Sequence, residues 1–336
     1  MLSPPRAVIL DTDFDTDCDD VGALATLHAL VDRGEASILG IVCSIPDSRI
    51  PAVVATINRA YGRGDIPIGL LSHGDWETDP RYVAYHHHRA HAEEAGWVPF
   101  HDAVLATKSA VAIVDARPTD AVGLYRQLLS SAEDASVVII AIGLASALAA
   151  LLASEPDAID PLPGRNLVAA KVARLVCMAE AEVPRGRDPF NWQMDLEAAA
   201  TVLDGWPTPV AISSFGRSVL TGAGFAALGR EDHPVVRAYT TYLNGPGRRR
   251  PSWDQIAVLC AVRGDASGFV EGERQRVLLD RTTGEHAWIA GDDVGARDHR
   301  AFLQVASDDH VTSVIDTLMT SSIGARDDVE RRRGGC

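Results

Sequence analysis

The sequence has few cysteines, and they show no pairing pattern. Five cysteines are scattered over 336 residues without a Cys-x-x-Cys pair. They indicate neither a disulfide framework nor a zinc site, so buried free thiols are expected. No secretory signal peptide is expected either. The strand-like segment Ala7–Leu10 follows Met1 within a few residues, which leaves no space for a charged region followed by an apolar region. We therefore expect a cytoplasmic protein.

Positive charge is scarce as well. The formal net charge is −15 at pH 7, whereas a nucleic-acid partner would need a basic face. Two compact basic runs, Arg248–Arg250 and Arg331–Arg333, adjoin glycines and are interpreted as a solvated loop and a loose terminus. The apolar stretch Ala135–Ala153 contains glycine and serine, which favours a strand followed by a helix over a membrane span. We expect neither a nucleic-acid nor a membrane partner.

Motifs for several common chemistries are absent. No Gly-x-Gly-x-x-Gly follows a strand candidate, and neither a P-loop nor a Gly-x-Ser-x-Gly elbow is present. Dinucleotide-binding, P-loop and serine hydrolase functions are therefore not supported. An EF-hand loop that started at Asp11 would need Gly at its sixth position and Glu at its twelfth, but the chain has Thr16 and Gly22 there. An EF-hand is therefore not supported either.

Short β-branched runs alternate with longer helical patterns along most of the chain. The strand candidates are Ala7–Leu10, Ile38–Val42, Ile66–Ile68, Ser136–Ile142, Ala173–Met178 and Pro209–Ser213, and the helix candidates are Val21–Arg33, Ala52–Tyr61, Asp120–Ser131, Ala145–Ala153 and Leu196–Leu203. This alternation predicts an α/β fold, with a doubly wound, mostly parallel open sheet, a Rossmann-like core and helices on both faces. Functional residues should follow the strands, since such sheets bind ligands beyond their carboxyl ends.

The last part of the chain has a different pattern. From about residue 265 it shows short strand candidates at Gln275–Leu279 and His286–Ile289 and a helix candidate at Val311–Met319. No linker or repeat separates this part from the rest. We predict a single domain over residues 1–336, with residues 265–336 as an appendage of it.

A dense run of aspartates follows the first strand candidate. Six carboxylates lie within ten residues, at Asp11, Asp13, Asp15, Asp17, Asp19 and Asp20. Their mutual repulsion in a partly buried loop requires positive charge, and a hard divalent cation is the simplest source. An exposed acidic loop with one or two helix-capping aspartates is the alternative.

A second interpretation of the same run is a phosphatase. Asp11-Thr-Asp13 after a strand resembles the haloacid dehalogenase type, in which the first Asp is a nucleophile and the second an acid. Gly291–Asp293 would then be the later acidic motif, but it lies beyond the parallel-sheet pattern, so this interpretation ranks second.

Stretches in the right order along most of the chain resemble the inosine-uridine nucleoside hydrolase family. Asp11–Asp20 is similar to its N-terminal signature, in a version with a longer loop. Tyr61–Gly69 and Val137–Leu148 are similar to its third strand and its strand-Gly-helix element. Asn191–Ala199 resembles its ribose-binding segment, and Pro251–Val258 the segment with its late metal-binding Asp.

The resemblance implies a hydrolase that cleaves the N-glycosidic bond of a ribonucleoside or related riboside, with calcium favoured over magnesium. The implied metal ligands are Asp13, Asp20, Asp254 and the backbone carbonyl of Ile142. Asp13 would also be the base toward metal-activated water, and Asp19 and Asn191 would bind sugar hydroxyls. A homo-oligomer is expected on the same ground.

Departures from the family pattern affect these assignments. At the family's shorter spacing, counting back from Asp19 and Asp20 selects Asp15 as the first ligand, but Asp13 is preferred because it lies closer to the strand end. Pro189 replaces a Glu of the ribose-binding segment, although Asp188 adjoins it as a candidate substrate-binding residue.

Three further departures concern polar or small residues. Ala147 replaces an Asn, Met178–Glu180 replaces a Met-Gly-Gly turn, and Trp253, another candidate substrate-binding residue, stands where some members carry a His. These changes suggest an altered substrate, or a catalytically silent calcium-dependent protein that binds nucleosides or sugars.

A histidine-rich stretch completes the set of candidates. His86–His88 and His91 could protonate a leaving base or bind a transition metal, but a solvated helix face is the preferred interpretation. The nearby rings of Tyr82, Tyr85, Trp97 and Phe100 could stack on a heterocycle or pack this segment onto the domain.

Overall fold

A nine-stranded sheet forms the centre of the molecule. The computed structural model describes residues 4–15, 17–72, 76–79, 82–290 and 297–333, with side chains through residue 323. The strand order is β11-β14-β8-β6-β5-β1-β2-β3-β4, and all neighbours are parallel except β11 and β14. The strands are β1 (Arg6–Thr12), β2 (Ala36–Cys43), β3 (Ile68–Leu70), β4 (Thr119–Asp120), β5 (Val137–Ala141), β6 (Val172–Met178), β8 (Val210–Ser213), β11 (Phe269–Glu271) and β14 (His299–Gln304).

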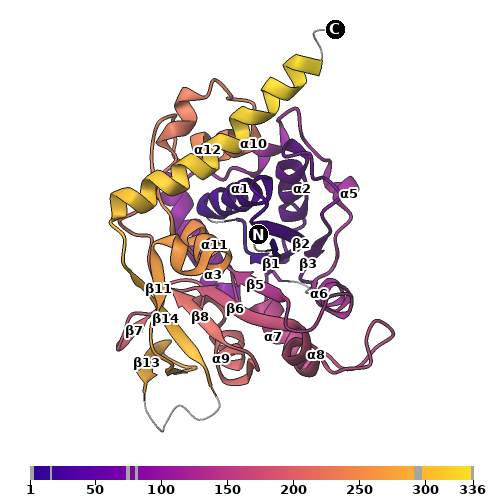
Figure 1. The fold of residues 1–336 in the computed structure, drawn as a ribbon, viewed down its shortest axis with the longest axis vertical. Coiled ribbons are helices and arrows are strands. Elements are labelled where there is room, and N and C mark those ends of the chain that lie inside the picture. Colours follow the sequence, from indigo (N-terminus) through magenta and orange to yellow (C-terminus); the bar gives the residue numbers. More distant parts are fainter. Residues whose placement is uncertain (1–3, 16, 73–75, 80–81, 291–296, 334–336) are drawn as a thin grey trace.

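Helices cover both faces of this sheet, as Figure 1 shows. One layer contains α1 (Asp19–Asp32), α2 (Ile50–Ala60), α10 (Pro234–Tyr242), α11 (Trp253–Arg263) and α12 (Asp308–Arg333), and the other contains α6 (Ala121–Ser130), α7 (Ser146–Ala153), α8 (Gly164–Lys171) and α9 (Leu196–Gly205). Alternation along β1 explains the two layers, because Val8 and Leu10 belong to one buried core and Ile9 to the other. The predicted fold class is confirmed.

The sheet changes its direction of growth between β1 and β5. The chain proceeds from β1 outward through β2, β3 and β4, and then from β5 in the opposite direction through β6, β8 and β14. Ligands of doubly wound sheets bind at such a switch point, beyond the carboxyl ends of the strands. Asp13 follows β1 and Ile142 follows β5, so two residues given roles from the sequence meet at this point.

Most predicted elements are present, with informative differences. The strand predicted at Ile66–Ile68 is β3, which begins only at Ile68; Pro67 has no N–H for the sheet, although its carbonyl accepts a hydrogen bond from Ile41. The helices α8, α10 and α11 were not predicted. In α11, every residue from Asp254 to Val262 is buried, so it lacks the polar face that reveals an amphipathic helix.

The C-terminal part is joined to the sheet and to the loop before Asn191. The predicted strands are β12 (Arg276–Leu279) and β13 (Glu285–Ile289), which form an antiparallel sheet with β7 (Arg185–Arg187). Meanwhile β11 and β14 extend the central sheet. The second Asp pair proposed for a phosphatase, in Gly291–Asp293, lies outside the described residues.

The last helix is longer than predicted. It runs over Asp308–Arg333, so the interpretation of Arg331–Arg333 as a loose terminus was wrong for the backbone. Its first turn carries Asp308 and Asp309, which favour a helix start, and apolar residues then recur on its buried face at Val311, Ile315, Leu318 and Ile323. Among the described residues, no helix combines the length and hydrophobicity that crossing a membrane requires.

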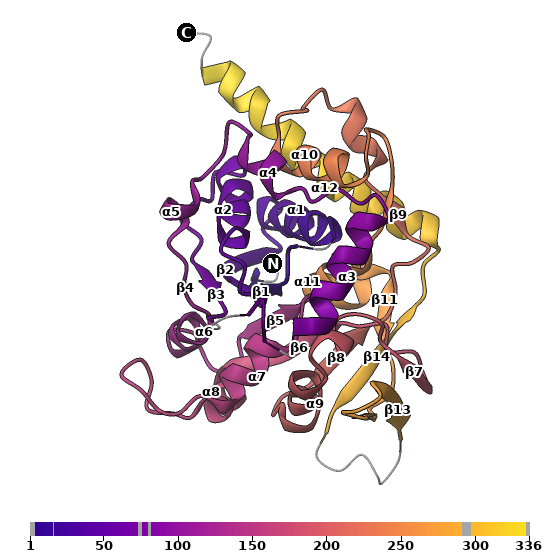
Figure 2. The same cartoon turned by 180° about the vertical axis from the view of Figure 1, so that it is seen from behind.

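The chain between β3 and β4 contains α3 (Val83–Glu94), α4 (His101–Leu105) and α5 (Ile113–Ala116), of which α4 packs on α2 and α10, and α5 on α2. A short antiparallel pair is formed by β9 (Leu220–Thr221) and β10 (Arg250–Pro251). Figure 2 shows α3 crossing in front of the layer that contains α11.

Candidate active site

A cavity of about 280 Å³ lies where β1, β5 and β6 end. Its acidic lining residues are Asp13, Asp17, Asp19, Asp20, Glu180, Asp188 and Asp254. Its other lining residues are His88, Ile142, Met178, Pro189, Phe190, Asn191, Tyr242, Arg250 and Trp253. All eight residues to which the sequence analysis gave a catalytic, metal-binding or substrate-binding role therefore lie on one cavity.

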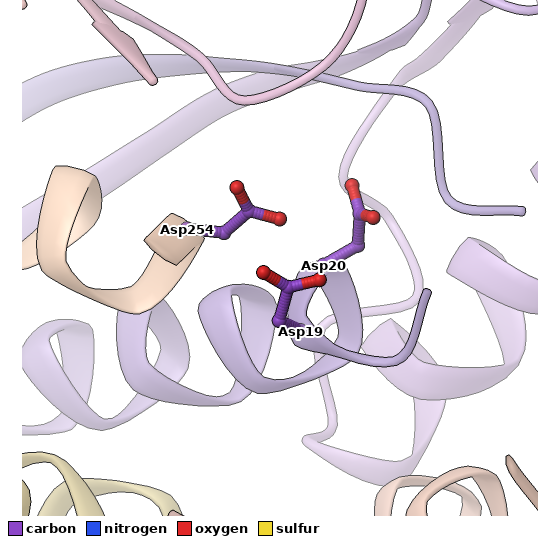
Figure 3. A group of neighbouring side chains, drawn as sticks. All are labelled: Asp19, Asp20 and Asp254. Carbon is purple, nitrogen blue, oxygen red and sulfur yellow. The ribbon is translucent and has the colours of Figure 1, made fainter. Parts of the chain in front are cut away.

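Three buried carboxylates converge within it. Asp19 and Asp20 are in the first turn of α1, and Asp254 is in the first turn of α11 and faces them in Figure 3. One oxygen from each lies within 4.8 Å of the others, a spacing that can hold a metal ion. Just before α1, Asp17 Oδ1 accepts hydrogen bonds from the backbone N–H of Cys18 (2.6 Å) and of Asp19 (3.4 Å).

Asp13 adds a fourth carboxylate beside these three. Its side chain is buried, and its Oδ2 accepts no hydrogen bond from any described residue. Burial, reinforced by the charge of Asp19, raises the pKa of Asp13 to about 8. Burial also raises the pKa of Asp19, Asp20 and Asp254 well above the usual range, with repulsion from neighbouring carboxylates adding to it. Ionising all four together requires a positive charge among them.

The loop after β5 approaches Asp13 closely. A Cβ at Gly143 would lie 2.5 Å from the Asp13 nitrogen and 2.7 Å from Ser44 Oγ, so only glycine fits without a shift. The preceding carbonyl, of Ile142, accepts a hydrogen bond of 3.1 Å from Asn191 Nδ2. This contact places the Ile142 carbonyl and Asn191 side by side on the cavity wall.

The six aspartates of the loop have different environments. Asp11 lies outside the cavity lining, and its Oδ2 accepts a hydrogen bond from Tyr125 at 2.5 Å. Asp15 is also outside it, where its carboxylate meets His101 Nε2 at 3.2 Å, the Tyr85 hydroxyl and Arg89. Asp17 pairs with Arg250, and the Thr12 hydroxyl donates a hydrogen bond to Asp20 Oδ1. Asp13, Asp19 and Asp20 line the cavity together.

Asp188 and Asn191 organise the segment that closes one wall. The two Asp188 oxygens accept backbone hydrogen bonds of 2.7 Å each from Glu180 and Trp192. Burial raises the pKa of Asp188 to about 6, and these hydrogen bonds oppose the rise. Asn191 Nδ2 also donates to the Met178 carbonyl at 3.2 Å. Its two amide hydrogens are thereby used, and its Oδ1, an acceptor, receives no hydrogen bond from the part of the chain that the structure describes.

Trp253 and Glu180 are also in contact on the cavity wall. Trp253 Nε1 donates to Glu180 Oε1 at 3.2 Å, and Glu180 also pairs with Arg217 at 2.9 Å. The departure of Met178–Glu180 from a Gly-Gly turn thus places a carboxylate on the cavity wall. The sequence analysis noted this departure without assigning Glu180 a role.

The histidines of α3 have different environments, and only some of them lie on a solvated face. His87 and His91 are exposed, as expected for a solvated face, while the His86 ring packs on Trp76 with a centroid distance of 4.7 Å. His88 lines the cavity mouth, with its ring 4.7 Å from that of Phe190. Burial of Tyr82, Tyr85 and Phe100 supports the packing interpretation for these rings.

Arg250 is the main residue that the sequence analysis missed. It was assigned to a solvated basic loop, yet it lines the cavity and pairs with Asp17. The available signal was its position directly before the Pro251–Asp254 segment. Its aromatic neighbour Trp97 and its ion-pair partner Asp17 lie far away in the sequence, so no local pattern connects them to it.

Comparison with known proteins agrees with this geometry. The sequence profile of a family described as inosine-uridine preferring nucleoside hydrolase matches residues 8–312. Comparison with curated protein sequences finds no match.

Similar solved structures show the same fold. A plant nucleoside hydrolase is 17% identical, with a TM-score of 0.69 and coverage of 95% of this chain and 100% of that one. An inosine-uridine preferring nucleoside hydrolase from Bacillus anthracis is 18% identical, with a TM-score of 0.60 and coverage of 94% and 99%. The type III effector protein XopQ, complexed with adenosine diphosphate ribose, is 15% identical, with a TM-score of 0.67 and coverage of 96% and 95%.

Proposed function

Because the chain belongs to the inosine-uridine preferring nucleoside hydrolase family, we propose that it is a metal-dependent glycosidase that hydrolyses the N-glycosidic bond of a ribonucleoside or related riboside. The observation that carries this proposal is the convergence of Asp13, Asp19, Asp20 and Asp254 on one cavity at the switch point of the sheet. The ligand is a small molecule, since the cavity measures about 280 Å³.

The residues of the cavity fit a divalent cation. Asp20 and Asp254 belong to the group whose oxygens lie within 4.8 Å of one another, together with Asp19, and Asp13 and Ile142 line the same cavity. These residues supply oxygen ligands only, which suits a hard cation, and calcium accepts such mixed carboxylate and carbonyl sets. The Asp13 Oδ2 without a hydrogen-bond partner among the described residues is the acceptor that such an ion would satisfy. When bound, the cation supplies positive charge that favours ionisation of water.

The chain's own residues then divide the work. Asp13 takes the proton of the water that attacks the anomeric carbon, as its burial beside the cluster favours. Asp19 accepts hydrogen bonds from sugar hydroxyls, and Asn191 presents Oδ1 to another, because its amide hydrogens are held by Ile142 and Met178. Fixing the sugar in this way supports an oxocarbenium-like transition state.

A ribose-containing ligand is supported by a similar structure. XopQ binds adenosine diphosphate ribose in its complex, and its fold is that of this chain. We propose that the present cavity likewise binds the ribose portion of its ligand.

The geometry does not favour the phosphatase interpretation. Its nucleophile would be Asp11, but Asp11 accepts the hydrogen bond of Tyr125 and lies outside the cavity lining. A nucleophile must instead reach the reacting atom.

Sugar release tests the proposal. The purified protein would be incubated with a panel of nucleosides and ribosides, with calcium and with chelator, and reducing sugar would be measured. We expect calcium-dependent release that Asp13→Asn lowers by about 100-fold or more. The exposed Asp115, outside the cavity lining, provides the control variant Asp115→Asn. Calcium-dependent binding of the same ligands without release would instead identify a silent binding protein.

A further inference from the structure

Arg250 is held in one orientation by an ion pair. Its Nε lies 2.9 Å from both carboxylate oxygens of Asp17, and its Nη2 contacts Asp17 Oδ2. Its backbone is fixed by the pairing of β10 with β9, where Arg250 lies opposite Thr221. The planar guanidinium group is therefore held along one edge.

Aromatic rings hold the same group from its faces. The guanidinium carbon lies 4.7 Å from the Trp97 ring centroid, 5.4 Å from that of Trp253 and 5.6 Å from that of Tyr242. These distances are within the range of cation–π attraction. Trp97 and Asp17, which are distant in sequence, thus converge with the nearby Tyr242 and Trp253 on a side chain that is 18% exposed.

One end of the guanidinium group is still available to a ligand. Nε and Nη2 are used by Asp17, whereas Nη1 donates no hydrogen bond to any described residue. Arg250 is also the sole Lys or Arg among the described residues that line the cavity. Adjacent Arg249 is exposed and outside the lining, so the basic run does not share one role.

Arg250 lies close to the residues that are proposed to act on the glycosidic bond. Its partner Asp17 accepts the N–H of Asp19, and its aromatic neighbour Trp253 directly precedes Asp254. The guanidinium group thus flanks the acidic cluster. On the same cavity, the rings of Trp253, Tyr242 and Phe190 offer apolar surface to a planar heterocycle.

We propose that Arg250 is a further catalytic residue, which binds the departing heterocycle of the substrate through Nη1. This inference rests on the proposed function. Water forms a bond to the anomeric carbon and gives its proton to Asp13, while the C–N electron pair leaves with the heterocycle. Arg250 keeps its proton and donates a hydrogen bond to an acceptor atom of the anionic heterocycle, which takes a proton from solvent on release.

The arrangement favours Arg250 over His88 for this role. His88 is exposed at the cavity mouth, where its ring contacts that of Phe190. Arg250 is fixed by an ion pair and three rings. A donor that is already oriented stabilises developing charge without reorganisation.

Leaving-group dependence tests the inference. A nucleoside that the protein hydrolyses would be compared with 4-nitrophenyl β-D-ribofuranoside, whose nitrophenolate departs without assistance. For Arg250→Gln we expect kcat on the nucleoside to fall about 100-fold to 1,000-fold. The loss on the nitrophenyl riboside should be at least about tenfold smaller. Arg249→Gln is the matched control, with no difference between the substrates, and guanidinium added to Arg250→Ala should restore part of the nucleoside activity.

Other outcomes would overturn the inference. Equal losses on both substrates would mean that Arg250 acts only by holding Asp17 and the loop. A leaving-group-dependent loss in His88→Gln but not in Arg250→Gln would assign the role to His88. Failure of the wild-type protein to release sugar from either substrate, with calcium bound, would reject the proposed function and this inference with it.

Discussion

The Tyr125 hydroxyl donates a hydrogen bond of 2.5 Å to Oδ2 of Asp11. Two positions later, Asp13 lines the cavity with an Oδ2 that no described residue satisfies. Neighbouring aspartates of one loop therefore have separate tasks. Asp11 ties β1 to α6, whereas Asp13 is left available to a ligand.

Removing the Tyr125 hydroxyl should affect stability more than chemistry. In Tyr125→Phe, the buried Asp11 carboxylate loses its donor, so we expect the free energy of unfolding to fall by about 1–3 kcal/mol. Urea unfolding would measure this, with sugar release measured in parallel. A loss of kcat as large as that of Asp13→Asn, at full stability, would contradict the separation of tasks.

Because Gly143 is tightly surrounded, adding one methyl group there should lower both stability and kcat. In Gly143→Ala the new Cβ would meet backbone atoms of Thr12 and Asp13, at 2.8 and 2.5 Å, so the loop must move away from Asp13. We expect a destabilisation of about 1–3 kcal/mol and a fall in kcat. Gly123→Ala in α6 is the control, since its nearest neighbour is 3.7 Å away. That variant should be as stable as the wild type or slightly more so.

Asp254→Asn should stabilise the metal-free protein and weaken its stabilisation by calcium. In metal-free protein the substitution removes one of four crowded carboxylates, so the variant should be more stable than the wild type. Calcium at 100 times its Kd should stabilise the wild type by about 2.7 kcal/mol, and the variant much less. Thermal unfolding with and without calcium measures both effects. An equal response of the two proteins to calcium would place the ion elsewhere.

The hydrogen bonds of Arg126 should stabilise the loop after α7. It is 1% exposed and donates to Asp157, Ser154 and the carbonyls of Asp160 and Leu162. Lysine cannot reproduce this planar fork, so Arg126→Lys should lower the free energy of unfolding by about 1–3 kcal/mol. Denaturant unfolding would test it, with exposed Arg249→Lys as the control. Indistinguishable midpoints for the two variants would show that the fork does not matter.

His299 should make the protein less stable in mild acid. Burial, with Arg297 and Arg276 nearby, lowers its pKa to about 4, and its Nδ1 accepts a hydrogen bond from the Val277 N–H at 3.0 Å. Between about pH 6.5 and 4, His299 is therefore protonated in the unfolded chain but neutral in the native protein, so the free energy of unfolding falls as the pH falls.

The matched variant isolates this contribution. His299→Asn keeps an acceptor for Val277 but does not titrate, so it should lack this part of the acid sensitivity. Since one pKa unit corresponds to about 1.4 kcal/mol, wild type should lose about 3 kcal/mol more than the variant over this pH range. Parallel stability curves for the two proteins would contradict this assignment.

The sequence by itself determined the layer architecture and the location of the acidic loop. Periodicity is a local property, so β1, α1 and β5 were predicted close to their observed bounds. The fully buried helix α11 was missed because it has no polar face to create a period. Composition alone indicated that a loop as acidic as Asp11–Asp20 needs positive charge.

Only the tertiary structure decided which carboxylates line the cavity. Asp11, Asp13 and Asp15 alternate regularly in the sequence, but their partners come from elsewhere in the chain, at Tyr125 for the first and His101 for the third. The same reason applies to Arg250, whose fixed orientation depends on Asp17 and on the Trp97 ring, both far away in the sequence. Side-chain direction in a loop depends on such long-range contacts, which residue spacing does not encode.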